Sequence, residues 1–271
     1  LKHLLVMSAA RELRRILARW NIDSERQTRL EAWTADDTAA LLRDRSHASF
    51  TLGHVRLFVE GAGVTLVVST LGMTIAVLLG LMLAIGRAYG PAWVGLAVRG
   101  YVELFRGTPV LLQLYLLYFG IMPWLRELVG FQGGVTVDAL VAAVVGLGLN
   151  YAAYEAEIFR GGIGAVPPGQ LEAAHALGMS TLLAVRRVIL PQAGRIALPG
   201  VTNDFISLLK DSSLVSVITV VELTKRMTIT AVDVRSWLIP GLLCAALYLA
   251  MSYPLSRLSL RLEKKLEGGP T

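Results

Sequence analysis

Residues 61–86 have the sequence GAGVTLVVSTLGMTIAVLLGLMLAIG, in which none of the 26 side chains is charged. A helix needs roughly 20 apolar residues to cross the hydrocarbon core of a bilayer. Two more uncharged runs, residues 107–125 and 236–256, contain 19 and 21 residues. These lengths predict several helices that cross a membrane. The chain is therefore expected to be an all-α, polytopic integral membrane protein.

The composition supports a membrane protein and argues against other classes. Of the 271 residues, 54% are hydrophobic and 17% are charged, whereas soluble domains average about 25% charged residues. The net charge of +6 predicts no nucleic-acid partner, because cytoplasmic loops of membrane proteins collect arginine and lysine. The four histidines lack metal-ligand spacing, so no metal site is expected. The single cysteine, Cys244, is expected to be a small packing residue.

The apolar runs predict about five membrane spans. They are expected at about residues 57–85, 105–124, 137–158, 196–221 and 237–256. The fourth run contains a proline and three charged residues. Irregular or polar segments at membrane depth are tolerated where they are buried in protein or line a cavity. The fourth span is therefore predicted to line a path.

Basic residues predict the orientation, because they gather in cytoplasmic loops. One set of loops, together with the C-terminal tail, holds eleven: Arg87, Arg99, Arg106, Arg160, Arg186, Arg187, Arg195, Arg257, Arg261, Lys264 and Lys265. The other short loops hold four: Arg126, Lys225, Arg226 and Arg235. Three arginines that precede the first span bring the second count to seven: Arg43, Arg45 and Arg56. The C-terminus and the loop after the third span are therefore predicted to be cytoplasmic.

Three regions are predicted along the chain. Residues 1–55 form a polar tail, residues 56–262 the transmembrane domain, and residues 263–271 a cytoplasmic tail. In the first tail, four apolar residues at helical spacing predict an amphipathic helix that suits a membrane surface: Leu13, Ile16, Leu17 and Trp20. Two interpretations of this tail stay open. It is either an accessory element or an over-long gene start, with Met7 as the alternative beginning.

Two spans carry small residues four positions apart. The first has Gly72, Ala76, Gly80 and Ala84, and the third has Gly148, Ala152 and Ala156. Such stripes let helix backbones approach closely in lipid. They are interpreted as packing surfaces rather than as ligand sites.

A charged hairpin of about residues 161–192 interrupts the apolar runs. Its core, VPPGQLEAAHALGMSTLLAVRRVILPQ, covers residues 166–192. The pattern predicts a helix over about 170–177 that ends at Gly178, which suits a helix C-cap. Ser180 is expected to cap a second helix, about 181–190, halted by Pro191. Helices this short are marginal alone, so the hairpin is expected to dock against a partner.

The hairpin resembles the EAA loop of ABC importer permeases. The matching residues are Glu172-Ala173-Ala174, Gly178 and the segment 188–191, in which Val188 replaces the usual isoleucine. Four further blocks resemble the polar amino acid uptake branch: FRGTPVLLQLYLLYFG (105–120), YEAEIFRGGIGAVPPGQLEAA (154–174), ILPQAGRIALPGVTNDFISLLKDSSLVSVI (189–218) and ELTKR (222–226). The resemblance covers about residues 61–262. The first 50 residues lie outside it.

The resemblance implies a transport subunit that is not itself an enzyme. Six hairpin residues are implied to couple the subunit to an ATPase: Glu172, Ala173, Ala174, Gly178, Arg186 and Arg187. The chain contains no G-x-x-x-x-G-K-[ST] phosphate loop, so ATP and magnesium are expected on a separate dimer of ATPase subunits. A second permease subunit, alike or related, and an extracytoplasmic amino-acid-binding protein are the other implied partners. The implied location is the bacterial inner membrane.

Polar residues in the third and fourth spans are candidates for the substrate path, because burying them without a partner is costly. They are Asn150, Tyr154, Glu155, Glu157, Asn203 and Asp204. Glu155 and Asp204 are candidates for contact with an α-ammonium or a cationic side chain, and helix-to-helix hydrogen bonding is the alternative. Glu157 is expected to pair with Arg160 one turn later. The segment 106–109 is predicted to start a helix at the cytoplasmic side, with Arg106 near phosphate headgroups.

Two other classes of function compete with this interpretation. In an ion- or proton-coupled secondary transporter, Glu155 and Asp204 would form a relay. The chain shows no inverted repeat of the kind that such carriers often have. A membrane scaffold would use the hairpin only to recruit a soluble enzyme. Dependence of uptake on ATP or on a proton gradient separates the transport classes.

Overall fold

The computed structural model describes residues 50–129 and 134–267, and every regular element in these ranges is a helix. The all-α prediction is therefore confirmed for the described chain. From Phe50 onward, the described residues belong to one compact unit. The amphipathic helix predicted in the N-terminal tail lies outside the described residues.

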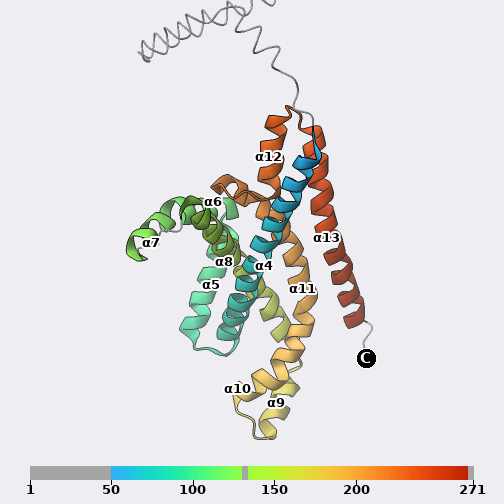
Figure 1. The fold of residues 1–271 in the computed structure, drawn as a ribbon. Helices are drawn as coiled ribbons and strands as arrows, with labels where there is room; N and C mark the ends of the chain where they lie inside the picture. The colour runs from blue at the N-terminus through green and yellow to red at the C-terminus, as the bar shows by residue number, and fades with distance from the viewer. Residues whose placement is uncertain (1–49, 130–133, 268–271) are drawn as a thin grey trace, which may run out of the picture. The chain divides into compact units, whose positions relative to one another are not determined.

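Three helices are long and apolar enough to cross a membrane (Figure 1). They are α4 (Leu52–Tyr89), α8 (Gly134–Gly164) and α13 (Leu238–Glu267). Helices α4 and α8 extend beyond their predicted spans at both ends and α13 at its C-terminal end, since the apolar runs mark only the part that lipid would contact. Helix α4 begins at a capping box, in which the backbone N–H of Thr51 donates to the His54 ring at 3.0 Å.

The second predicted span, residues 105–124, is broken. Helix α5 (Ala92–Gly107) ends inside it, and the chain turns by 102° into a second stretch, Val110–Leu128. That stretch comprises α6 (Val110–Tyr115), the π-helix η1 (Leu116–Ile121) and most of α7 (Met122–Val129). Proline disfavours a helical conformation in the residue before it, and Thr108 before Pro109 is extended, with φ −117° and ψ 145°. The break adds α5, which the apolar runs did not predict.

The fourth predicted span, residues 196–221, corresponds to α11 (Leu190–Asp211) and a 3₁₀-helix, η3 (Ser212–Ile218). Helix α11 is not among the apolar candidates, so the described chain has three such helices, or four with the bent pair. By length and composition the described helices give three or four spans, against the five that the apolar runs predicted, and the difference is the polar helix α11. A short helix, α12 (Leu223–Asp233), connects η3 to α13.

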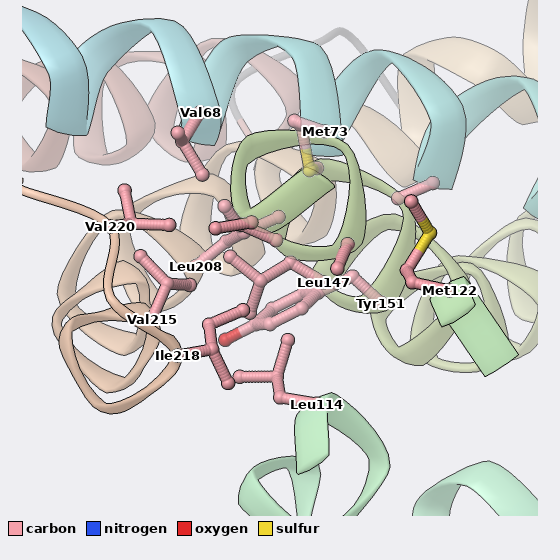
Figure 2. Packing of buried hydrophobic residues seen from close by; sticks show 14 residues of the cluster. Val68, Met73, Leu114, Met122, Leu147, Tyr151, Leu208, Val215, Ile218 and Val220 are labelled. Atoms are coloured by element: carbon pink, nitrogen blue, oxygen red, sulfur yellow. The ribbon is translucent and has the colours of Figure 1, made fainter. Parts of the chain in front are cut away.

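The core forms where α4, α8, α11 and η3 meet. Figure 2 shows Val68 and Met73 of α4 lying against Leu147 of α8, with Leu208 of α11 beside them. The small-residue stripes lie in the α4–α8 contact, because a Cβ added to Gly80 would lie 2.5 Å from the Cβ of Glu155. The packing interpretation of these stripes is therefore confirmed.

The hairpin consists of α9 (Pro168–Ala176), α10 (Thr181–Ala184) and a π-helix, η2 (Val185–Ile189). It lies at the opposite end of α11 from α12 (Figure 1). Gly178 adopts φ +80° after α9, as its predicted capping role requires. Ser180 occupies the N-cap of α10, but its side chain makes no capping hydrogen bond.

Pro191 does not halt the second helix of the hairpin, contrary to the prediction. The π-turn η2 runs directly into α11, and the N–H of Leu190 donates to the carbonyl of Val185, five residues back. Before Pro123, Met122 donates in the same way to Leu117. A proline ring clashes with the carbonyl four residues earlier in a regular α-helix. The wider π-turn leaves room for the ring, so the helix continues.

Candidate functional site

A cavity of about 480 Å³ opens where the break after α5 faces α8 and α11. Its lining comes from three parts of the chain: the segment 106–110, three residues of α8 (Asn150, Tyr151 and Tyr154) and three residues of α11 (Asp204, Ser207 and Asp211). The broken span therefore supplies one wall, and the polar fourth span supplies another. The prediction that the fourth span lines a path agrees with this position.

The cavity carries opposite charges on different walls. The guanidinium of Arg106 lies 5.1 Å from the centre of the Tyr154 ring, in a cation–π contact. The hydroxyl of Tyr151 on α8 donates to the carboxylate of Asp211 on α11 at 2.8 Å, which occupies that carboxylate. One buried carboxylate oxygen of Asp204 has no hydrogen-bond partner among the described residues. The lining thus offers a cation and an unoccupied acceptor to a small molecule.

The segment 106–109 was predicted to start a helix, and α6 does begin directly after it, at Val110, but Arg106 itself belongs to the preceding helix. It lies one residue before the end of α5, which closes at Gly107. The sequence gives no direct sign of this, because the uncharged run after Arg106 is continuous up to Leu125. Only the bend at Pro109 brings Arg106 to the cavity. Tyr151, Ser207 and Asp211 were also missed as lining residues.

The other predicted path residues lie outside the lining. Glu155 is fully buried, and neither carboxylate oxygen has a hydrogen-bond partner in the described part of the chain. Its backbone packs against Gly80 of α4. Asn203 lies on an exposed part of α11. Glu155 and Asn203 therefore stay candidates without a place in this cavity.

Glu157 pairs with Arg160 at 2.7 Å, as the sequence predicted. It also pairs with Arg87 at the end of α4. This ion-pair cluster joins the C-terminal end of α4 to the C-terminal part of α8, the helix that leads to the hairpin. Glu157 therefore has partners within the described chain, and it does not line the cavity.

The hairpin presents charged and apolar groups together. Glu172 and Ala173 are exposed on α9, whereas Ala174 is buried against the rest of the hairpin. Arg186 and Arg187 are exposed on η2. Two leucines that the sequence did not single out, Leu177 at the end of α9 and Leu182 in α10, are 78% and 79% exposed. The list of candidate docking residues is thus Glu172, Ala173, Leu177, Leu182, Arg186 and Arg187.

A second buried polar cluster lies around Glu222. Its carboxylate accepts the N–H groups of Thr224 and Lys225 at 2.8 and 2.7 Å, which caps α12. It also accepts the hydroxyls of Thr65 and Tyr248 at 3.4 and 3.0 Å. Because these partners come from α4, α12 and α13, the ELTKR block is a structural junction in this chain.

Residues 76–268 match the family described as binding-protein-dependent transport system inner membrane component. The chain belongs to this family. It is 38% identical over 213 residues to the octopine transport system permease protein OccM of Rhizobium meliloti, covering 76% of this chain and 84% of that protein. It is 34% identical over 222 residues to the arginine transport system permease protein ArtQ of Bacillus subtilis, covering 81% and 96%.

Solved structures agree with the family. An amino acid ABC transporter crystallised with histidines matches with a TM-score of 0.67 and 38% identity, over 79% of this chain and 96% of that one. The MetNI methionine ABC transporter in an inward-facing conformation also gives a TM-score of 0.67, at 20% identity, over 80% and 99%. At that identity the second likeness supports the fold alone. The chain is thus a membrane-spanning permease subunit of an ABC importer, and the secondary-transporter alternative is not supported.

Proposed function

We propose that this chain forms the translocation path of an importer for polar amino acids, together with a second permease subunit. The cavity between α5, α8 and α11 carries the proposal. A cationic amino acid has a carboxylate and a positively charged side chain, and the cavity offers Arg106 to the first and Asp204 to the second. Such complementarity of charge favours the correct partner. The named relatives handle octopine and arginine, which are ligands of this chemical class.

The proposal includes a separate ATPase that drives transport. The exposed leucines Leu177 and Leu182 form an apolar centre on the hairpin, with Glu172 on the neighbouring helix α9 and Arg186 and Arg187 as a charged rim. An apolar core with a polar rim is typical of a protein interface. The partner is a dimer of ATPase subunits, which binds ATP and magnesium and moves the membrane helices through the hairpin. A binding protein outside the cytoplasm delivers the amino acid.

Uptake into proteoliposomes tests this function. The chain is purified with its ATPase and permease partners, and the vesicles contain ATP with the binding protein and labelled L-arginine or L-glutamine outside. We expect uptake that stops without ATP or without the ATPase subunit, and that an uncoupler leaves unchanged. Uptake that needs no ATP and collapses with an uncoupler would contradict the proposal.

The proposed orientation predicts that Ala173 is reachable only from the cytoplasm. Ala173 is exposed, and the single native cysteine, Cys244, is buried with 5% exposure, so an Ala173→Cys variant reports one site. A membrane-impermeant maleimide should label it in inside-out vesicles and leave it unlabelled in intact spheroplasts. Labelling from the outer face would reverse the orientation and remove the hairpin from the ATPase.

Neutralising Asp204 is expected to lower the transport of cationic amino acids selectively. A hydrogen bond to a charged group contributes roughly 1.5–3 kcal/mol, and 1.4 kcal/mol is tenfold in affinity. We expect Asp204→Asn to raise the KM for L-arginine about tenfold and that for L-glutamine much less. The matched control is Asp233→Asn, at an exposed carboxylate of α12, which should change neither value. Equal losses for both substrates would remove Asp204 from the ligand contacts.

A further inference from the structure

The break between α5 and α6 leaves backbone carbonyls without partners in their own helix. The last carbonyls of any helix lack intrahelical donors, and the lipid core supplies no water to replace them. At this break the carbonyl of Leu104 accepts the hydroxyl of Thr108 at 2.8 Å. The carbonyls of Phe105 and Thr108 need donors from elsewhere in the chain.

Gln113 supplies these donors from the first turn of α6. The two hydrogens of its Nε2 face three acceptors: the carbonyl of Phe105 at 2.9 Å, and the carbonyl and hydroxyl of Thr108 at 3.1 and 2.8 Å, so one hydrogen is shared between two of them. Carbonyl oxygens only accept hydrogen bonds, so the nitrogen of the amide has to face them. The orientation of the Gln113 side chain is therefore fixed by the break itself.

The other end of the Gln113 amide is held by α8. Its Oε1 accepts the Nδ2 of Asn150 at 3.0 Å, and the same nitrogen donates to the carbonyl of Phe105 at 3.2 Å. Gln113 and Asn150 thus form an amide clamp that closes the end of α5 against α8. The clamp explains why an asparagine lies buried in an apolar helix, at 4% exposure.

The amide clamp lies directly beside the charged wall of the cavity. Phe105, whose carbonyl is held, precedes Arg106 in the chain. Asn150 precedes Tyr154 by one helical turn on α8, so both lie on the same face. Arg106 stacks on that tyrosine. A shift of the clamped carbonyl by a fraction of its hydrogen-bond length moves the arginine relative to the ring and to Asp204.

We propose that Gln113 is a positioning residue for Arg106: its amide holds the end of α5 so that the guanidinium faces the cavity, oriented for the carboxylate of the transported amino acid. This inference rests on the proposed function. Gln113 itself does not line the cavity, so it acts through the backbone of the broken span. Preorganising a charged group lowers the ordering cost of binding.

The test is a double-mutant cycle on the purified complex without the binding protein. Binding of L-arginine and of L-argininamide, which lacks the carboxylate, is measured by calorimetry. We expect Arg106→Ala and Gln113→Leu each to weaken L-arginine binding about tenfold, equivalent to roughly 1.4 kcal/mol. Binding of L-argininamide should change less than twofold in either variant. Because Gln113 acts through Arg106, the double variant should bind L-arginine no more weakly than Arg106→Ala alone.

Two further variants keep the test decisive. Gln113→Glu retains the size and polarity of the side chain but turns a donor into an acceptor, so it should reproduce the loss if Gln113→Leu does not fold. Thr202→Val is the control, because within the described residues its hydroxyl donates only to the carbonyl of Leu198 in its own helix, and it should bind like the wild type.

The possible failures can be told apart. Additive losses in the double variant, or equal losses for L-arginine and its amide, would show a merely structural role for Gln113 and overturn the inference. Wild-type affinity in both Gln113 variants would do the same. A wild-type complex that binds neither L-arginine nor L-glutamine would overturn the proposed substrate site and the inference with it.

Discussion

Gly80→Ala is expected to force α4 and α8 apart and to destabilise the folded subunit severely. The added Cβ would lie 2.5 Å from the Cβ of Glu155 and 3.0 Å from the backbone nitrogen of Ala156. Neither atom is the mobile end of a side chain, so the helices themselves have to move. Overpacking a core costs about 1–3 kcal/mol when side chains adjust, and here the backbone has to adjust as well. A loss of at least about 3 kcal/mol is therefore expected.

The measurement is the apparent melting temperature of the detergent-purified complex, together with the fraction that elutes as a single species in size-exclusion chromatography. Gly63→Ala is the matched control, since it makes the same change in the same helix and its Cβ would meet no atom within 4 Å. A melting temperature of Gly80→Ala equal to that of Gly63→Ala would show that the α4–α8 contact yields easily.

The stripe that contains Gly80 was predictable because helical periodicity is a local property. Small residues at every fourth position share one face of a helix whatever surrounds it, and lipid gives such a face no role other than close packing. Glu172, Gly178 and the Arg186–Arg187 pair were placed on a hairpin for a similar reason. Glycine and proline mark the ends of short helices wherever they occur.

The break at Pro109 and the continuity at Pro191 were not predictable in this way. Pro109 follows Gly107-Thr108 and Pro191 follows Ile189-Leu190, and in both places hydrogen bonding by the surroundings decides whether the helix continues. At Pro109 the freed carbonyls find Gln113 and Asn150, so the chain bends. At Pro191 a π-turn absorbs the ring, so the helix continues. A hydropathy pattern contains no information on side-chain amides from other helices or on a change from α-helical to π-helical hydrogen bonding, so it predicts neither outcome.

The residues of the candidate site also divide into those that the local sequence predicts and those that depend on tertiary packing. Buried acids were recognised as costly from the sequence, and Asp204 lines the cavity. Glu155 has the same chemistry but lies against Gly80. Tyr154, its neighbour in the chain, faces the cavity instead, because successive residues of a helix point about 100° apart. Which of them meets the cavity is set by how α8 packs on α4 and α11, and this is a tertiary property.

Glu172→Ala is expected to uncouple ATP hydrolysis from transport. Glu172 is exposed and forms no hydrogen bond or ion pair within residues 50–129 and 134–267, so its removal should leave the folded subunit intact. Its proposed partner is a basic group of the ATPase subunit. We expect docking to bury this pair, and truncating one member of a buried, hydrogen-bonded charge pair costs about 2–5 kcal/mol. The number of amino acids imported per ATP should then fall at least about tenfold, measured as uptake and phosphate release in the same proteoliposomes.

Gly178→Ala tests the same hairpin through its backbone. Gly178 has φ +80° and open space around its Cβ position, so alanine adds strain without a collision. A left-handed conformation costs a non-glycine residue about 1–2 kcal/mol, which should shift the turn that presents Leu177 and Leu182. Gly169→Ala in α9 is the matched control, because its φ is not in the left-handed region. Glu263→Ala, at an exposed position of α13, is the control for Glu172→Ala.

The two hairpin variants distinguish the loss of a charge pair from a change in the geometry of the turn. Glu172→Ala should respond to ionic strength differently from the wild type, since it lacks a screened charge pair, whereas Gly178→Ala should keep the wild-type salt dependence at a lower level of transport. Both should keep the melting temperature of the membrane domain, because the hairpin lies beyond the α4–α8–α11 core. Wild-type transport per ATP in both variants would contradict the coupling role. It would show that neither the Glu172 carboxylate nor the conformation of the turn affects how the ATPase drives transport.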